Sequence, residues 1–200
     1  MYCILIAGMP ASGKSSFAHW LNVNSHLPYM SKDEIKELLF DEIGFSSRAE
    51  KVALGVAAEK ILYSFAENQM KANLPFILEN NFDDSSRDGI TKLLRRYGYT
   101  PLTVLFDGDT RVLYERFLER DQSPHRHRGH VVNTCYPEQG ERQPYIPMSF
   151  EAFENGMEKR GFRRFEAGGK VISVDSTDFR QVDYQKIYDE IVAMVHCPSI

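Results

Sequence analysis

The chain has little cysteine and no long hydrophobic run. Its three cysteines, Cys3, Cys135 and Cys197, are odd in number and far apart, so we expect no disulfide framework. No stretch approaches the ~18 consecutive apolar residues that a membrane-spanning helix needs. The short apolar stretch at the start has no basic flank, so we expect no signal peptide. Together these absences favour a soluble protein in a reducing cytoplasm.

An excess of positive charge is also missing. The 24 Lys and Arg residues against 28 Asp and Glu residues give a net charge of −4, which argues against a sequence-independent coat on nucleic acid. The chain has no internal repeats and no low-complexity tracts. Its 200 residues and 42 % hydrophobic content predict a single globular domain over residues 1–200, with room for a small inserted lid.

A glycine-rich segment near the N-terminus is the most informative motif. Gly8-Met9-Pro10-Ala11-Ser12-Gly13-Lys14-Ser15 fits the pattern G-x-x-x-x-G-K-[ST]. In that pattern, backbone N–H groups surround phosphates, the lysine reaches the β- and γ-phosphates, and the hydroxyl binds Mg²⁺. The apolar run before it predicts a buried strand, and the residues from Ser15 and Ser16 onward have helical spacing. We therefore predict that residues 8–16 bind the phosphates of a nucleotide at a helix N-terminus.

Short apolar runs alternate with longer amphipathic segments along the rest of the chain, which is typical of a mainly parallel α/β sheet. The runs predict strands over residues 2–7, 27–30, 76–78, 102–106 and 170–174. The amphipathic segments predict helices over residues 15–21, 31–43, 48–72, 86–97, 109–120, 150–159 and 184–195. Residues 121–147 are rich in Pro, His and Arg and lack apolar periodicity, which predicts a mobile lid loop.

Polar residues follow several of the predicted strands, where the functional groups of a parallel α/β protein gather. Asp33 follows the second strand and is the candidate general base; the alternative is a capping box, Ser31-x-x-Glu34, in which acidic residues only stabilise the helix start. Glu79 ends the third strand and could bind Mg²⁺ or substrate. Asn80, which follows it, could contact substrate or form a turn.

Four arginines surround the predicted lid. Arg116 and Arg120 are four residues apart on one helix face, and Arg126 and Arg128 follow within the loop. Guanidinium groups that a closing lid delivers are expected to stabilise charge on a transferring phosphoryl group. Ordinary solvation of a helix surface is the alternative.

The same loop contains potential metal ligands at irregular spacing. No C-x-x-C pair or H-E-x-x-H helix accompanies them, so a zinc site is the weaker interpretation and phosphate-facing donors the stronger. The residues concerned are His125, His127, His130 and Cys135.

Taken together, these motifs resemble the P-loop kinases of the polynucleotide-kinase-like and zeta-toxin-like group. The loop matches that group's G-x-P-x-S-G-K-S, and Lys32-Asp33-Glu34 matches its basic-Asp-acidic triplet. Arg120 corresponds best to its lid arginine and Arg116 to the preceding helix arginine, while residues 126–130 resemble an R-H-x-G-H lid element. The resemblance implies a three-layer P-loop NTPase fold with a five-stranded parallel sheet in the order 2-3-1-4-5 under a mobile lid of residues 121–147.

The chain departs from the polynucleotide members at several positions. Those members have Asp where Glu79 stands and Asn where Phe117 stands, and a phosphate-gripping arginine is matched here only by Lys36. The lid loop is also longer than in the phage-type enzymes. These differences leave the residues for ATP chemistry intact. They bear on the identity of the acceptor, because the lid and the helix that leads into it determine substrate specificity.

The expected function is that of an ATP- and Mg²⁺-dependent kinase which transfers the γ-phosphoryl group to a hydroxyl of a small molecule or nucleoside. Lys14 would bind the β- and γ-phosphates, Ser15 and Glu79 the metal, and Asp33 the acceptor hydroxyl. Arg116 would contact the nucleotide, and Arg120, with Arg126 or Arg128, would stabilise the transferring group. The residues expected to contact substrate are Lys36, Glu79, Asn80 and Arg128.

Two alternatives remain open. A polynucleotide 5′-hydroxyl kinase is possible, although the acidic balance and the absence of an aromatic-basic stripe favour a small molecule. A non-catalytic nucleotide-binding regulatory module is the alternative from another class. A GTPase-like switch is disfavoured because no N-K-x-D motif exists, and Asp41-Glu42-Ile43-Gly44 falls at a helix end.

Overall fold

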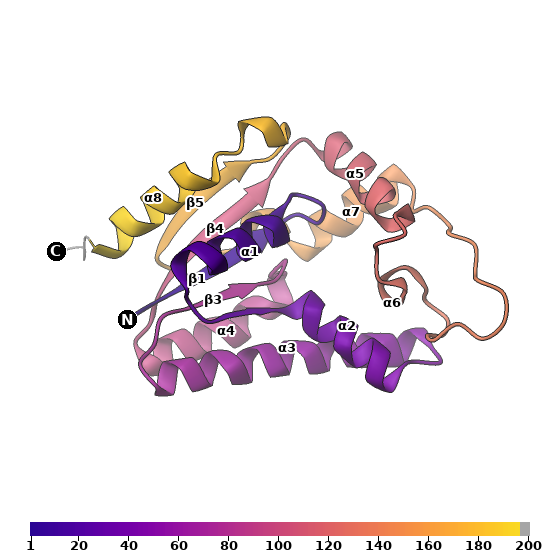
Figure 1. Ribbon diagram of the computed structural model, residues 1–200, viewed down its shortest axis with the longest axis horizontal. Coiled ribbons are helices and arrows are strands. Elements are labelled where there is room, and N and C mark those ends of the chain that lie inside the picture. Colours follow the sequence, from indigo (N-terminus) through magenta and orange to yellow (C-terminus); the bar gives the residue numbers. More distant parts are fainter. Residues whose placement is uncertain (197–200) are drawn as a thin grey trace.

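A five-stranded, all-parallel sheet forms the centre of the computed structural model, which describes residues 1–196 (Figure 1). The sheet order is β2-β3-β1-β4-β5, so the predicted fold class and strand order are confirmed. The strands are β1 (Tyr2–Gly8), β2 (Tyr29–Ser31), β3 (Phe76–Glu79), β4 (Thr100–Asp107) and β5 (Lys170–Asp175). Because β1 is central, residues 3–8 are all buried, which explains the continuous apolar run that precedes the glycine-rich loop.

Helices cover both faces of the sheet. On one face α3 (Arg48–Lys71) and α4 (Asp84–Tyr97) pack on alternate residues of β1, and α1 (Lys14–Ser25) and α8 (Tyr184–His196) pack on the other. The remaining helical segments are α2 (Lys32–Ile43), α5 (Thr110–Gln122), α6 (Arg128–Val131), α7 (Phe150–Arg160) and the short turns η1 (Phe162–Arg164) and η2 (Phe179–Gln181). Cys197 lies outside the described residues.

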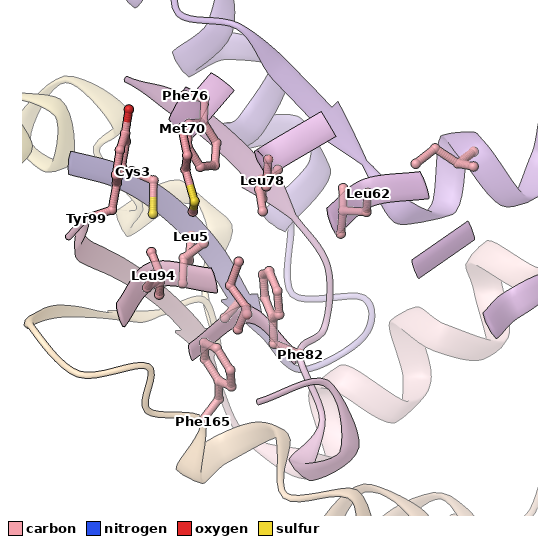
Figure 2. Close-up of a cluster of buried hydrophobic side chains, with 14 of the residues drawn as sticks. Cys3, Leu5, Leu62, Met70, Phe76, Leu78, Phe82, Leu94, Tyr99 and Phe165 are labelled. Atoms are coloured by element: carbon pink, nitrogen blue, oxygen red, sulfur yellow. The ribbon is translucent and has the colours of Figure 1, made fainter. Parts of the chain in front are cut away.

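The larger core lies between the sheet and helices α3 and α4. Figure 2 shows Leu5 and Leu78 of the sheet in the same cluster as Leu62 and Met70 of α3, with the rings of Phe82 and Phe165 stacked at 4.8 Å between centroids. Burying these side chains is worth about 1.5–3 kcal/mol each. This packing fixes the carboxyl ends of β1 and β3, which carry the residues of the candidate site.

The segment 121–147 differs from the irregular loop that the sequence predicts. It contains the short helix α6, and Val132 just beyond that helix is buried with Phe40 and Phe45 in an apolar cluster. Tyr136 pairs with Phe45 through two backbone hydrogen bonds of 2.7 and 2.8 Å. The predicted lid is therefore anchored on α2 and the start of α3, and its mobility stays a prediction.

Gly8, the last residue of β1, has a backbone that a side chain would not tolerate. Its φ is +118°, and an added Cβ would lie 2.0 Å from the carbonyl oxygen of Phe106. We expect Gly8→Ala to lower the free energy of unfolding by at least about 2 kcal/mol, measured by urea denaturation. The matched control is Gly156→Ala in α7, where nothing lies within 4 Å; it should stabilise the protein by up to about 1 kcal/mol. Equal midpoints for Gly8→Ala and the wild type would contradict this account.

Candidate functional site

The glycine-rich loop lies between β1 and α1 at the carboxyl edge of the sheet. Gly8, Ala11 and Gly13 all have positive φ, which bends the loop around the N-terminus of α1. The Ser12 hydroxyl donates to the Met9 carbonyl over 2.7 Å and braces the loop from inside. Such a loop presents successive backbone N–H groups, together with the positive end of a helix, to an anion.

A cavity of about 660 Å³ opens in front of this loop, within the roughly 300–1,000 Å³ that is typical of small-molecule and cofactor sites. Residues 10–16 of the loop line it, whereas Gly8 and Met9 do not. Met9 packs instead in an apolar cluster with Leu113 and Phe153. Gly8 and Met9 were predicted to contact phosphate, but they lie behind the loop and support its conformation.

Lys14 is the buried cation of the loop. Its side chain is almost inaccessible, and its Nζ donates to the Met9 carbonyl over 2.5 Å. Burial lowers the pKa of Lys14 to about 8, although the carboxylates of Glu79 and Asp33 oppose the shift. A buried ammonium with a neutral carbonyl as its hydrogen-bond acceptor is poised to accept an anionic ligand, because a phosphate would restore the charge balance.

Glu79, at the end of β3, connects two serines that are distant in sequence. Ser15 Oγ donates to Glu79 Oε1 over 3.3 Å, and Ser31 Oγ donates to Glu79 Oε2 over 2.6 Å. Burial and the nearby Asp33 raise the pKa of Glu79, while Lys14 opposes them. A buried carboxylate and a serine hydroxyl beside a phosphate loop are hard oxygen donors of the kind that Mg²⁺ requires. The residues present therefore fit the predicted metal, and their role as ligands stays a prediction.

The capping-box interpretation of residues 31–34 is wrong. Ser31 precedes α2, but its side chain caps no backbone N–H because the hydroxyl is bound to Glu79. Glu34 bonds to His19 Nε2 and to the Tyr29 hydroxyl instead of the helix start. A charge-assisted bond to a buried carboxylate is stronger than a neutral capping bond, which explains the outcome.

Asp33 lines the cavity with a half-exposed side chain. Its Oδ1 lies 3.2 Å from Lys36 Nζ, the predicted substrate contact, which also lines the cavity. Burial alone would raise the pKa of Asp33, but the charges of Lys36, Arg126 and protonated His130 hold it well below its usual range. Asp33 is therefore a carboxylate throughout the neutral pH range. The structure places it between the phosphate loop and the cations of α2 and the lid.

The predicted arginines have different surroundings. Arg116 donates to the carbonyls of Ser176 and Thr177 over 2.6 and 2.7 Å, and its guanidinium lies 3.7 Å from the centre of the Phe179 ring. Both Arg116 and Phe179 line the cavity beside Gly13. This flat cation–aromatic wall is a surface on which a nucleobase could stack.

Arg120 and Arg126 share one carboxylate, that of Asp121. Arg120 Nη2 lies 3.0 Å and Arg126 Nε 3.5 Å from Asp121 Oδ1, and all three residues line the cavity. The charge of Arg120 also lowers the pKa of Lys14, so the two cations face the same space. Asp121 thus holds both lid arginines toward the phosphate loop in this conformation.

Two predicted substrate contacts lie outside the cavity. Arg128 pairs with Glu138 at 2.6 Å and with the Gln143 carbonyl, which ties the lid to itself. Asn80 is buried behind the site, and its neighbour Asn81 lines the cavity instead. The position of neither side chain supports contact with a substrate in this conformation.

The lid histidines make separate contacts. His127 Nε2 lies 3.0 Å from Asp41, and His130 Nε2 lies 2.9 Å from Glu37. Within residues 1–196, no group of three or more His, Cys, Asp and Glu side chains is placed to hold a metal ion. These two histidines instead fasten the lid to α2.

The cavity residues that were not predicted from the sequence include Arg48, Lys51, Tyr145, Arg160 and Phe179. Lys51 is buried, and its Nζ donates to the carbonyls of His130 and Val132 over 2.8 and 2.5 Å. Nothing in the sequence separates it from the solvent-facing lysines of other helices. Arg48 is the first residue of the same helix, and no local sequence pattern identifies it as a cavity residue either.

Comparisons with known proteins agree with this geometry. A family model described as an AAA domain matches residues 3–134. A search of curated proteins finds no match. A candidate kinase from Chloroflexus aurantiacus is 27 % identical, with a TM-score of 0.80 over 96 % of this chain and 97 % of that one.

Two solved structures of lower identity share the fold. A sugar kinase from Janibacter has a TM-score of 0.56 at 13 % identity, covering 98 % of this chain and 95 % of its own. A gluconokinase from Sinorhizobium meliloti has a TM-score of 0.54 at 16 % identity, covering 98 % and 91 %. None of the described helices is long and apolar enough to traverse a bilayer.

Proposed function

This chain belongs to the AAA domain family, and from that premise we propose that it is an ATP-dependent phosphotransferase that acts on a hydroxyl of a small molecule. The observation that carries the proposal is the convergence of three groups in one cavity. These are the phosphate loop with Lys14, the oxygen pair of Ser15 and Glu79, and the carboxylate of Asp33. Phosphoryl transfer requires this combination of a phosphate cradle, a metal site and a group that positions the acceptor.

The relatives favour a kinase over a passive nucleotide-binding module. The Chloroflexus protein, whose identity to this chain extends over nearly its full length, is a candidate kinase. The sugar kinase and the gluconokinase show that the fold itself accommodates phosphoryl transfer to small hydroxyl compounds. An intact set of charged residues at the loop gives no reason for lost turnover.

In the proposed reaction, the backbone N–H groups of residues 10–16 and Lys14 Nζ bind the triphosphate. Ser15 and Glu79 would hold Mg²⁺, which neutralises phosphate charge when bound. Arg116 and Phe179 would hold the base, and Arg120 and Arg126 would exchange Asp121 for oxygens of the transferring group. Because both arginines already face the loop, this exchange requires little rearrangement of the lid.

Asp33 would accept the hydrogen bond of the acceptor hydroxyl and aim its oxygen at the γ-phosphorus. The new P–O bond forms as the bond to the β–γ bridging oxygen breaks, ADP leaves with that electron pair, and the hydroxyl proton passes to Asp33. A carboxylate with a lowered pKa is a weak base. Its main contribution is therefore orientation, and the proton moves late in the transfer.

Nucleotide binding and acceptor-dependent turnover test this proposal. ATP or ADP with Mg²⁺ should raise the melting temperature of the wild-type protein, as any ligand of the native state does. ADP release should then appear with one class in a panel of hydroxyl metabolites, nucleosides and 5′-hydroxyl oligonucleotides. A melting temperature indifferent to ATP, ADP, GTP and GDP would reject nucleotide binding. Thermal stabilisation by nucleotide without ADP release in the presence of any acceptor would favour the regulatory module. A preference for oligonucleotides as acceptors would favour the polynucleotide kinase.

A further inference from the structure

The cavity is strongly cationic although the protein is acidic. Eight Lys and Arg side chains and only three carboxylates line it, in a chain whose net charge is −4. The carboxylates are those of Asp33, Glu79 and Asp121, and the cations are Lys14, Lys36, Arg48, Lys51, Arg116, Arg120, Arg126 and Arg160. Such a concentration of one sign in a cleft attracts ligands of the opposite charge.

Six of the eight cations form two groups, one on each side of Asp33. Lys14, Arg116 and Arg120 belong to the phosphate loop and to α5, which are the nucleotide side. Lys36, Arg48 and Lys51 come from α2 and the start of α3, on the far side of the cavity. We call these last three residues the far cations. Lys36 contacts Asp33 directly, and both Lys36 and Arg48 are close enough to Lys51 to lower its pKa.

Two of the far cations, Arg48 and Lys51, are poorly neutralised by the protein, whereas Lys36 is paired with Asp33. Lys51 Nζ donates only to neutral oxygens, the third being Asn133 Oδ1 at 3.1 Å, and Arg48 Nη1 donates to that same oxygen over 2.8 Å. Burial, with the neighbouring positive charges, lowers the pKa of Lys51 to about 7. Mutual repulsion of this kind is a cost that an anionic ligand would remove.

Two buried donors on the cavity wall also lack hydrogen-bond partners. Among the described residues, Arg126 Nε and the Tyr145 hydroxyl are buried and make no hydrogen bond, although Arg126 pairs electrostatically with Asp121. Buried donors are rarely left unsatisfied in native proteins, so this wall has unused capacity for a ligand's acceptor oxygens.

The nucleotide does not account for all of this charge. A triphosphate with one bound Mg²⁺ carries roughly two net negative charges, and the phosphate loop and α5 supply three cations on their own side. An acceptor whose hydroxyl reaches Asp33 would extend from there toward α2 and α3. Its remaining groups would then meet the far cations.

We propose that the acceptor is a small anionic hydroxyl compound, whose carboxylate or phosphate group binds Lys36, Arg48 and Lys51 while its hydroxyl faces Asp33. This inference rests on the proposed kinase function and specifies its substrate class. The anion would also be connected to the lid, because Lys51 and Arg48 are the residues that contact Asn133 and the backbone around it.

A binding experiment separates this inference from the kinase proposal. Calorimetry first measures binding of the non-hydrolysable analogue AMPPNP with Mg²⁺, and its absence would reject the proposed function. Inorganic phosphate is then titrated into AMPPNP-saturated protein. We expect one further phosphate site at millimolar or tighter affinity, weakened by added salt. No phosphate binding to nucleotide-saturated protein would overturn the inference while leaving the kinase proposal intact.

Charge variants locate that site. Arg48→Gln should weaken phosphate binding about tenfold or more and change AMPPNP affinity less than about twofold, whereas Arg48→Lys should restore most of the phosphate affinity. The matched control is Lys60→Gln, an exposed lysine on the same helix that does not line the cavity. Unchanged phosphate affinity in Arg48→Gln, or an equal loss in Lys60→Gln, would overturn the assignment.

A matched series of acceptors identifies the anionic group. Glycerol, glycerate and glycerol 3-phosphate share one carbon skeleton, as do glucose, gluconate and glucose 6-phosphate, and ADP release is measured with each. The charged members should be phosphorylated at least about tenfold faster than the neutral ones, and the better of the two anions distinguishes a carboxylate from a phosphate ester. A neutral member that is as fast as its charged partners, or a 5′-hydroxyl oligonucleotide faster than all of them, would overturn the proposal.

Discussion

Replacing Lys14 by methionine should abolish ATP turnover and leave the protein folded. The backbone cradle of the loop does not depend on this side chain, whereas the charge on the transferring phosphoryl group does. Loss of one preorganised cationic donor should lower turnover at least about a hundredfold. Methionine also replaces a buried ammonium, so the melting temperature at neutral pH should equal or exceed that of the wild type.

The pH dependence gives this prediction a second readout. The pKa of Lys14 is lowered to about 8 by burial, below its ordinary value of 10.5. The folded protein therefore disfavours the protonated form of Lys14. This lowers the free energy of unfolding below pH 8, and the loss is recovered as the pH rises from about 8 toward 10.5, the pKa of Lys14 in the unfolded chain. Bound phosphate favours the protonated form, so ATP binding above pH 8 should take up a proton. Calorimetry in buffers of different ionisation enthalpy would detect this uptake, and Lys14→Met should lose it.

The exposed Lys60→Met is the matched control and should leave turnover and proton uptake unchanged. Substantial turnover in Lys14→Met would exclude Lys14 from the chemistry. A large loss of melting temperature in that variant would show instead that the Met9 contact organises the loop.

Replacing Asp33 by asparagine should separate chemistry from nucleotide binding. Asparagine has nearly the same shape but lacks the negative charge that orients the acceptor hydroxyl and takes up its proton late in the transfer, so phosphoryl transfer should fall at least about a hundredfold. ATP affinity should stay close to that of the wild type, because Asp33 lies on the acceptor side of the loop. The half-exposed ion pair with Lys36 contributes at most about 1 kcal/mol, so stability should change little.

Glu34→Gln is the matched control for Asp33→Asn. Glu34 is the adjacent acidic residue, but it contacts His19 and Tyr29 and does not line the cavity. Its variant should retain most activity. If Asp33→Asn instead keeps most of its activity on the true acceptor, the mechanism is wrong, and Glu79 becomes the candidate base because it is the other carboxylate beside the loop.

The nucleotide side of the cavity could be predicted from the sequence because its signals are local. The loop is one contiguous motif, and Asp33 and Glu79 follow strand ends that a parallel sheet must bring to one edge. The side chains that contact Asp33 and Glu79 could not be predicted in the same way. Ser31 has the spacing of a capping residue, and only the pairing of β2 with β3 brings its hydroxyl to Glu79.

Apart from Lys36, the far cations could not be predicted, because their contacts join distant parts of the chain. Lys51 is buried only because residues 130–133 fold over it, nearly eighty positions later. The sequence shows no apolar periodicity in that segment, so neither α6 nor the packing of Val132 against Phe40 could be predicted. The prediction that Arg128 contacts substrate gains no support for a different reason, because its partner Glu138 lies within the same loop.

The division of the cavity along the chain has a consequence for how such a protein can diversify. The far cations come from a single stretch between β2 and β3. The triphosphate side depends on β1, α1 and α5, together with Glu79 at the end of β3. The three far cations could therefore be mutated to retarget the enzyme without disturbing its energy donor. Libraries confined to Lys36, Arg48 and Lys51 would sample new acceptors at little risk to the machinery that every acceptor shares.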